Sequence, residues 1–160
     1  MIKAYIGVGT NIDRERHARM AYLELQKLAS DLCVSPIYEC DPVGFSSQPF
    51  YNFVVSFSTQ LSLEILSHEL REIEFKWGRE KDAQKYQDRT LDLDLILFGS
   101  CLSIQEPELP RSDVFKYPFV TKPLFDLDPK LVIPGDGRTI AEIWQTMQPV
   151  DTLTPISLSL

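Results

Sequence analysis

The chain has 160 residues, of which 44% are hydrophobic and 11% aromatic, so it can fold as one globular domain with a hydrophobic core. Its formal net charge of -7 argues against a general nucleic-acid binder, since phosphate backbones repel an acidic surface. No apolar run is long enough for a signal peptide or a membrane span. With three cysteines that form no CxxC pair and two histidines, we expect reduced thiols in a cytoplasmic protein, and no zinc site.

The first predicted elements are a strand, a helix and a second strand. Residues 2–8 form a short apolar run that ends at "GVGTN" and predicts a buried strand. A helix is predicted over 13–31 by apolar residues at helical spacing, namely Ala18, Ala21, Leu25, Leu28 and Leu32. The segment "VSPIYEC" (34–40) predicts the second strand, in which Pro36 indicates an edge or a bulge.

A loop, a strand and a second helix are predicted next. The Pro, Gly and Ser content of "DPVGFSSQP" (41–49) is typical of a loop. The alternation in "FYNFVVSFST" (50–59) predicts a strand. A helix fits 62–77, with Gly78 as its C-terminal stop and an apolar stripe made of Leu63, Leu66, Leu70, Ile73 and Trp77.

The rest of the chain contains a long polar segment, one more strand and a final helix. The polar stretch "GREKDAQKYQDR" (78–89) precedes the strand within "RTLDLDLILFG" (89–99), and a helix is predicted over 138–147. With no repeat and no linker, residues 1–160 are expected to form a single domain. The order β-α-β-β-α-β predicts an α+β, ferredoxin-like sheet, mostly antiparallel, with helices on one face and the other face free for a ligand.

Two aspartates stand in alternate positions of the "LDLDL" strand. Side chains two apart on a strand share a face, about 7 Å apart, so Asp92 and Asp94 repel each other, and burial raises that cost. The other face is expected to hold Leu91, Leu93, Leu95 and Leu97, while Ile96 and Phe98 continue the aspartate face. One interpretation is a half-exposed strand with a polar face. The other is a Mg²⁺ site, because Mg²⁺ takes one or two carboxylates and leaves its other positions to water and phosphate.

Basic residues gather just before this strand, at Arg79, Lys81, Lys85 and Arg89. They either belong to a solvated loop with interspersed acidic residues, or form a lid over 79–88 that closes on a polyphosphate. "GVGTN" matches neither the dinucleotide-binding glycine pattern nor a P-loop, so phosphates would be held by metal and side chains.

Phe50 and Asn52 share one face of the 50–59 strand. An aromatic ring beside a carboxamide can stack on a flat heterocycle and bind its polar edge, since the carboxamide both donates and accepts hydrogen bonds. Ordinary packing of Phe50 and a structural Asn52 is the alternative interpretation.

Four stretches together resemble one enzyme family. "AYIGVGTN", "DPVGFSSQPFYN", "GRE…RTLDLDLILFG" and "FVTKPLFDLDPKLVIPGDG" occur in this order along nearly the whole chain, as in the 6-hydroxymethyl-7,8-dihydropterin pyrophosphokinases of folate biosynthesis. The resemblance implies a ferredoxin-like fold and transfer of the β,γ-pyrophosphoryl group of ATP to a pterin hydroxymethyl group. It also implies that AMP is released and that two Mg²⁺ ions are bound.

The resemblance also implies a role for residues that match its motifs. The catalytic residues would be Arg79, Lys81, Arg89, Asp92 and Asp94, with Asp92 and Asp94 as the metal ligands. The nucleotide-binding residues would be Glu74, Arg79, Arg89 and Arg111. The pterin-binding residues would be Val43, Phe50, Asn52 and Phe119.

Three segments depart from the family pattern. "QDRT" replaces the usual GPRT or APRT, and "QPFYN" is one residue short, so Tyr51 is an alternative to Phe50. In "LPRSDVFKYPFV" a His and an Arg that commonly contact the triphosphate are missing, and Arg111 and Lys116 are expected to compensate. Two alternatives follow: a catalytically weakened paralogue that binds a pterin or nucleotide, or a structural interaction domain. The expected partners are small molecules, not nucleic acid or membrane, and the expected state is a monomer.

Overall fold

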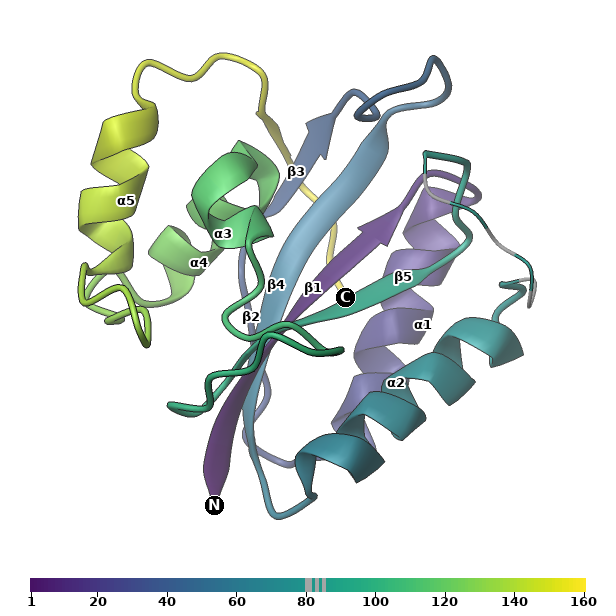
Figure 1. Ribbon diagram of the computed structural model, residues 1–160. Coiled ribbons are helices and arrows are strands. Elements are labelled where there is room, and N and C mark those ends of the chain that lie inside the picture. The colour runs from purple at the N-terminus through teal and green to yellow at the C-terminus, as the bar shows by residue number, and fades with distance from the viewer. Residues whose placement is uncertain (80–81, 83, 85) are drawn as a thin grey trace.

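A six-stranded antiparallel sheet organises the molecule in the computed structural model, which describes residues 1–79, 82, 84 and 86–160 (Figure 1). The strands are β1 (Ile2–Thr10), β2 (Cys33–Val34), β3 (Ile37–Cys40), β4 (Phe50–Thr59), β5 (Asp92–Phe98) and β6 (Thr154–Ile156). The helices are α1 (Arg14–Gln26), α2 (Leu63–Lys76), α3 (Asp113–Lys116), α4 (Pro118–Leu127) and α5 (Ile140–Met147). Among the described residues, no helix combines the length and the apolar character that crossing a membrane requires.

The predicted ferredoxin-like topology is confirmed. The strand order is β5-β1-β4-β3-β6, and β1 lies between β4 and β5, antiparallel to both. β6 extends the sheet beyond this pattern by pairing with β3. The short β2 pairs with β4.

One predicted helix is shorter in the structure and one predicted strand is divided, and in both regions a side chain forms a hydrogen bond to the backbone of β4. The predicted 13–31 helix ends at Gln26, and beyond it the Asp31 carboxylate accepts a hydrogen bond from the Ser58 backbone N–H at 2.9 Å, which draws the chain toward β4. The predicted 34–40 strand is interrupted before Pro36, as expected from that proline. There, the Ser35 hydroxyl accepts a hydrogen bond from the Val54 N–H.

The alternation predicted for β5 breaks near its end. The pairing of β1 with β5 shifts between Tyr5 and Ile6, which are paired with Leu97 and Leu95. Ile96 is therefore an extra residue in a β-bulge, and side chains after it change face. The prediction that Leu97 shares a face with the other leucines is thus wrong: Leu97 packs with Ile96 in one apolar cluster, and Phe98 packs in the other.

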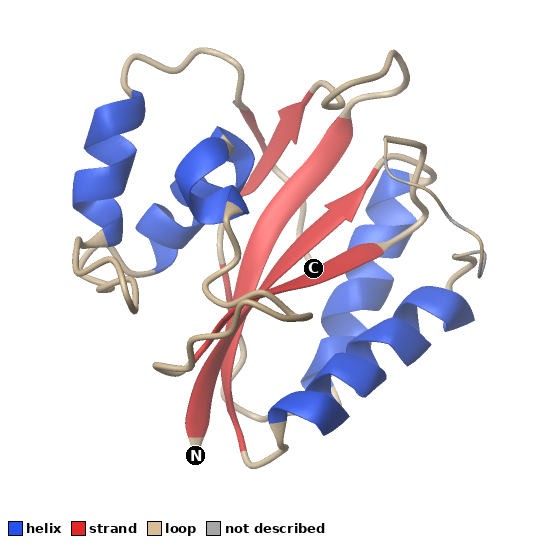
Figure 2. Cartoon of the chain, in the orientation of Figure 1, coloured by secondary structure: helices blue, strands red, loops and turns tan. Residues whose placement is uncertain are grey.

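The two clusters lie on opposite faces of the sheet. On one face α1 and α2 cover the strands, with Ala21, Leu25 and Leu66 fully buried. On the other face α3, α4 and α5 pack on the sheet, on the side away from α1 and α2 (Figures 1 and 2). The expectation of a free second face is therefore wrong for the part that these helices cover. Apolar residues such as Leu124 and Ile133 bury that part. The sequence analysis did not identify them, because prolines interrupt the periodic pattern between residues 107 and 134.

Candidate active site

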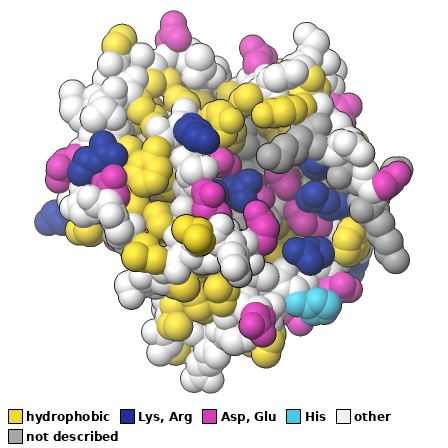
Figure 3. Space-filling model, in the orientation of Figure 1, with side chains coloured by type: hydrophobic (Ala, Val, Ile, Leu, Met, Phe, Trp, Pro, Cys, Tyr) yellow, Lys and Arg dark blue, Asp and Glu magenta, His cyan; other side chains and the backbone are white. Residues whose placement is uncertain are grey.

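A cleft of about 650 Å³ occupies the part of the second sheet face that α3–α5 leave open. Ten of the described residues predicted for the site line it: Val43, Phe50, Asn52, Glu74, Arg79, Arg89, Asp92, Asp94, Arg111 and Phe119. Lys81 was also predicted and lies outside the described residues, as do 80, 83 and 85 of the predicted lid over 79–88. In Figure 3, acidic and basic side chains gather in the middle of the face shown, between groups of hydrophobic side chains.

The register of the sheet explains how distant residues meet in this cleft. Gly9 of β1 lies between Asp92 of β5 and Asn52 of β4, and Asn52 in turn is opposite Tyr38 of β3. Directly opposed residues in antiparallel strands present their side chains to the same face. One row across the sheet therefore joins a predicted metal ligand to the predicted pterin-binding carboxamide, with a glycine between them.

The glycines of "GVGTN" make the floor of the cleft. A Cβ atom at Gly9 would lie 3.2 Å from Asn52 Oδ1, and one at Gly7 would lie 3.1 Å from Ile96 Cδ1. These positions thus leave space that any other residue would occupy. The sequence analysis missed them, although two glycines two apart in a buried strand are a signal of close approach by a ligand or by neighbouring groups.

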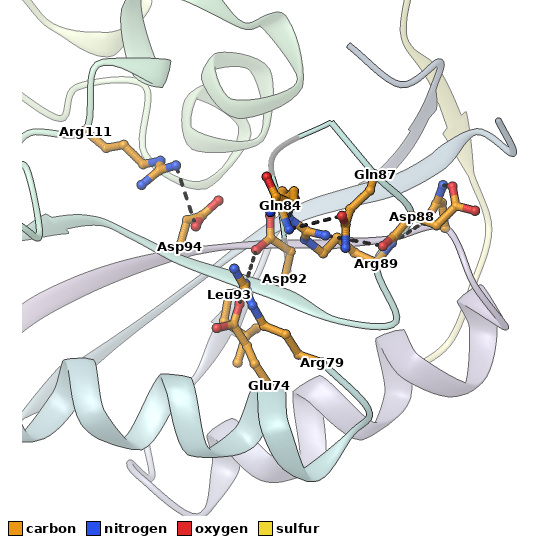
Figure 4. Close-up of polar contacts among 11 residues, drawn as sticks. Glu74, Arg79, Gln84, Gln87, Asp88, Arg89, Asp92, Leu93, Asp94 and Arg111 are labelled. Carbon is orange, nitrogen blue, oxygen red and sulfur yellow. Dashed lines mark hydrogen bonds and ion pairs between the residues drawn. The ribbon is translucent and has the colours of Figure 1, made fainter. Parts of the chain in front are cut away.

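At the acidic end of the cleft, arginines balance only part of the negative charge of the neighbouring carboxylates (Figure 4). Burial and the neighbouring charge of Asp92 raise the pKa of Asp94 well above its ordinary value. Arg111 opposes this shift, with Nη2 3.7 Å from Asp94 Oδ1. The Arg111 Nε atom also donates a hydrogen bond to Asp113 at 2.8 Å, which fixes the direction of the guanidinium group.

A second arginine bridges the other carboxylates. Arg79 lies beside both Glu74 and Asp92, with Nη1 3.0 Å from Glu74 Oε2 and 3.4 Å from Asp92 Oδ1 (Figure 4). Glu74 is only 6% exposed, and its Oε2 also accepts the Leu93 backbone N–H at 2.8 Å. Burial, together with the charge of Asp92, raises the Glu74 pKa to about 7. Glu74 is therefore a buried link between α2, β5 and the cleft.

Arg89 lines the cleft, but its guanidinium group bonds to nearby backbone. Its Nη atoms donate to the carbonyl oxygens of Gln84 and Asp88. Its backbone N–H donates to Asn11 Oδ1 at 2.8 Å, and the Asn11 Nδ2 group donates to Asp88 Oδ1 at 2.8 Å and to the Gln48 carbonyl at 3.1 Å. Asn11, which the sequence analysis did not single out, thus joins the 41–49 loop to the segment before β5.

Aromatic side chains and a carboxamide form the opposite end of the cleft. Asn52 is 8% exposed, and its Nδ2 group donates to Cys40 Sγ at 3.0 Å. The Phe50 ring contacts Phe45 edge to face, and the Phe119 ring stacks on Tyr117 with centroids 5.1 Å apart. This end has the flat surfaces and the polar edge that a planar heterocycle requires.

Phe50 lines the cleft, whereas its alternative, Tyr51, does not. β4 runs without interruption from Phe50, so Tyr51 points to the opposite face. There the Arg14 guanidinium carbon lies 4.0 Å from the centroid of the Tyr51 ring. Tyr51 therefore belongs to the α1 side of the sheet, and Phe50 faces the cleft.

Comparison with known proteins gives this cleft its context. The family model described as 7,8-dihydro-6-hydroxymethylpterin-pyrophosphokinase matches residues 5–129. The chain belongs to this family. It is 36% identical over 146 residues to the 2-amino-4-hydroxy-6-hydroxymethyldihydropteridine pyrophosphokinase of Pseudomonas aeruginosa, an alignment that covers 88% of this chain and 89% of the relative.

Relatives from other bacteria support the assignment to the pyrophosphokinase family. Proteins of the same name from Haemophilus influenzae and Bacillus subtilis are 33% and 35% identical to this chain. The first alignment covers 89% of this chain and 91% of the relative, and the second covers 78% and 77%. The matches therefore extend over most of both chains.

Two of the departures from the family pattern have a structural role here. In "QDRT", the Asp88 carboxylate accepts the Asn11 hydrogen bond, and hydrogen bonds from Ser47 and Asn11 lower its pKa. In "LPRSDVFKYPFV", Arg111 points into the cleft toward Asp94. Lys116, which was expected to compensate together with Arg111, is not among the residues that line the cleft.

Proposed function

We propose that this chain transfers the pyrophosphoryl group of ATP to the hydroxymethyl group of 6-hydroxymethyl-7,8-dihydropterin and releases AMP, as a step of folate biosynthesis. The family and the names of its relatives support this activity. The observation that carries it is a cleft with carboxylates and guanidinium groups at one end and a carboxamide among aromatic rings at the other. Such a cleft can place a polyphosphate against a flat, polar ring.

Asp92 and Asp94 are the proposed ligands of two Mg²⁺ ions. The residues fit a hard cation. The pKa of Asp94 is raised because burial and the negative charge of Asp92 disfavour its ionised form, and a bound cation would stabilise that form. Within residues 1–79, 82, 84 and 86–160, no group of three or more His, Cys, Asp or Glu side chains is placed to hold a metal. A site with two carboxylates suits Mg²⁺, which takes its remaining oxygens from phosphate and water. When bound, Mg²⁺ neutralises charge on the phosphates.

Arg79 and Arg111 are proposed to contact the phosphates from opposite sides of the aspartate pair. Each guanidinium group already lies within 4 Å of an aspartate, so it can turn to a phosphate oxygen without a long movement. The proposal extends to Arg89, Lys81 and Glu74 as further nucleotide-site residues. Protein groups then act mainly by positioning the reactants, which is the usual contribution in phosphoryl transfer.

The pterin is proposed to bind at the other end, between Phe50 and Phe119 and against Asn52. The Asn52 carboxamide offers both a donor and an acceptor to the ring edge. Val43, which is 40% exposed, borders the same end of the cleft. The row of residues across the sheet, from Asn52 through Gly9 to Asp92, supports an orientation in which the hydroxymethyl group of the pterin faces Asp92.

The enzyme is proposed to act as a monomer with one domain over residues 1–160. Both apolar clusters pack on the same sheet, which supports the single domain. The position of Arg111 beside Asp94 supports catalysis over a binding-only paralogue, since it supplies a cation where the usual His and Arg are missing.

The direct test is to incubate the protein with ATP, Mg²⁺ and 6-hydroxymethyl-7,8-dihydropterin and to measure AMP release. Asp92→Asn and Asp94→Asn should abolish release while the far-ultraviolet circular dichroism spectrum stays unchanged, because each removes a charged metal ligand but conserves shape. Arg138→Ala is the matched control, since Arg138 pairs with Asp136 and does not line the cleft. AMP release by either aspartate variant at the wild-type rate would contradict the metal site.

A further inference from the structure

The proposed pterin site has walls from two different parts of the fold. Asn52 and Phe50 belong to β4, in the sheet, whereas Phe119 lies in the first turn of α4. The gap into which a flat ring must fit is therefore set by how α4 is placed above the sheet. Stacking and van der Waals contact fall off within fractions of an ångström, so this gap has to be fixed closely.

Apolar packing alone does not fix it. Val120 and Leu124 of α4 are buried against the sheet face, in a cluster with Val54 and Ile96. Such contacts are non-directional, so they define the position of a helix less sharply than a directional bond does. A hydrogen bond depends strongly on distance and angle, so one between α4 and the sheet would define the position of the helix.

Tyr38 makes that hydrogen bond. Its hydroxyl group donates to Asp126 Oδ2 at 2.5 Å, and Tyr38 is 7% exposed. In the described part of the chain, this is the single side-chain hydrogen bond between α4 and the sheet. Burial, with Asp126 adding to it, raises the pKa of Tyr38, so the phenol stays protonated and remains a donor.

The same pair is linked to both walls of the proposed site. Tyr38 lies directly opposite Asn52 in the β3–β4 ladder, so the two side chains share the face that bears the cleft. Asp126 follows Phe119 by seven residues in α4, which is about two helical turns. We infer that Tyr38 and Asp126 form a positioning pair that sets the height of Phe119 above Asn52, and thereby the width of the pterin site.

Asp126 has a second partner, Lys122, and a variant of Lys122 can separate the effect of charge at Asp126 from the effect of its bond to Tyr38. The Lys122 ammonium lies 2.8 Å from Asp126 Oδ1, one turn earlier in the same helix. This ion pair is internal to α4 and does not join the helix to the sheet. Removing Lys122 therefore alters the charge of the cluster but leaves the Tyr38–Asp126 link in place.

The inference rests on the proposed function, and the experiment tests the two separately. Pterin dissociation constants are measured by fluorescence titration in the presence of Mg²⁺ and a non-hydrolysable ATP analogue, for Tyr38→Phe, Phe119→Ala and the double variant. Tyr38→Phe keeps the ring but loses the hydrogen bond, and should weaken pterin binding about tenfold. Affinity for the ATP analogue, and kcat at saturating pterin, should stay within about twofold of wild type.

Double-mutant coupling shows whether Tyr38 acts through Phe119. In the Phe119→Ala background, Tyr38→Phe should cause little further loss, because the wall that it positions is already gone. Asp126→Asn should retain near wild-type affinity, since either end of the amide can pair with a hydroxyl group. Lys122→Gln should also retain it. Thermal unfolding of each variant shows that the protein measured is folded.

Each outcome decides one of the two claims. If Phe119→Ala and Asn52→Ala weaken pterin binding but Tyr38→Phe does not, the positioning pair is overturned and the proposed function stands. Additive losses for Tyr38→Phe and Phe119→Ala, or an equal loss for Lys122→Gln, would likewise overturn the pair. If Phe119→Ala and Asn52→Ala bind the pterin normally, the proposed pterin site fails and the inference fails with it.

Discussion

At the scale of single residues, Glu74 is the clearest case of a group whose environment changes its chemistry. It is almost completely buried, and its carboxylate faces Asp92, so its pKa rises from an ordinary value of 4.5 to about 7. The hydrogen bond from Leu93 and the nearby Arg79 act in the other direction. The folded protein therefore holds a proton on Glu74 at a pH where the unfolded chain has released it.

This gives a pH dependence of stability with a defined sign. Because the folded-state pKa lies above the unfolded value, raising the pH from about 4.5 to about 7 lowers the free energy of unfolding. The loss from Glu74 is on the order of 2–3 kcal/mol, and Glu74→Gln should remove it. Urea unfolding of both proteins at pH 5 and pH 8, without Mg²⁺ or nucleotide, measures it. Equal pH dependence in wild type and variant would contradict the assignment to Glu74, since the raised pKa of Asp94 acts in both.

A second prediction at this scale concerns Arg111. Arg111→Ala removes a cation that lies between Asp94 and Asp113 and lines the cleft. MgATP affinity should fall about 10- to 100-fold, which corresponds to roughly 1.5–3 kcal/mol for a charge-assisted hydrogen bond. Calorimetric titration with a non-hydrolysable analogue measures this, with Arg138→Ala as the control. An unchanged dissociation constant would exclude Arg111 from the phosphate site.

At the scale of elements, β1 shows how a strand can be shaped for a ligand. It is an inner strand of the sheet, yet Gly7 and Gly9 carry no side chain on the cleft face, while Ala4, Ile6 and Val8 are buried on the opposite face. Glycine in a strand interior weakens the strand, so its presence twice here has a local cost. The cost is offset by the packing of α1 and α2 on the other face.

Gly9→Ala tests this interpretation. The added Cβ would lie 3.2 Å from Asn52 Oδ1 and 3.7 Å from Phe50 Cδ1, so it would displace the carboxamide or fill the floor of the cleft. Pterin affinity should fall about tenfold or more, since a hydrogen-bonding group moves out of position. Stability should change by less than about 1 kcal/mol, because alanine lowers the conformational entropy of the unfolded chain, and this gain offsets the strain of the added Cβ in the folded state. Fluorescence titration and urea unfolding measure the two effects, and wild-type pterin affinity would show that the floor does not contact the ligand.

At the scale of the whole molecule, Asn11 joins segments that lie far apart in the sequence. Its side chain is 4% exposed and bonds to Gln48, Asp88 and the Arg89 backbone. The 41–49 loop and the segment that leads into β5 therefore meet at the end of β1. Both segments contribute to the wall of the cleft, through Val43 of the loop and Tyr86 and Arg89 of the segment before β5.

Asn11→Ala should loosen this junction. It removes three hydrogen bonds, but Gln48 and Asp88 are exposed and can bond to water instead, so the free energy of unfolding should fall by about 1–3 kcal/mol. Amide hydrogen exchange should become faster in residues 44–48 and 86–89, and stay unchanged in the β1–β4 ladder. Exchange that is unchanged in both loops would show that other contacts hold them together.

The sequence by itself determined the repeating local features of this protein. Residues two apart on a strand must share a face. It could therefore be predicted without a structure that Asp92 lies on the same face as Asp94, and Phe50 on the same face as Asn52. The helical stripes on α1 and α2 and the ferredoxin-like order of elements followed from the same kind of short-range pattern. The resemblance to the pyrophosphokinases then named the site residues, all of whose described members line one cleft.

Only the tertiary structure decided how these pieces are placed against one another. Strand register puts Gly9 between Asp92 and Asn52, and a bulge in β5 sends Leu97 and Phe98 to unexpected faces. Prolines interrupt the periodicity of residues 107–134, so α3 and α4, which cover part of the second face, and the bond from Tyr38 to Asp126 left no local pattern, whereas α5 was predicted as a helix over 138–147. The physical reason is range: periodicity depends on neighbours in the chain, whereas register, coverage and the width of a cleft depend on contacts between residues far apart in sequence.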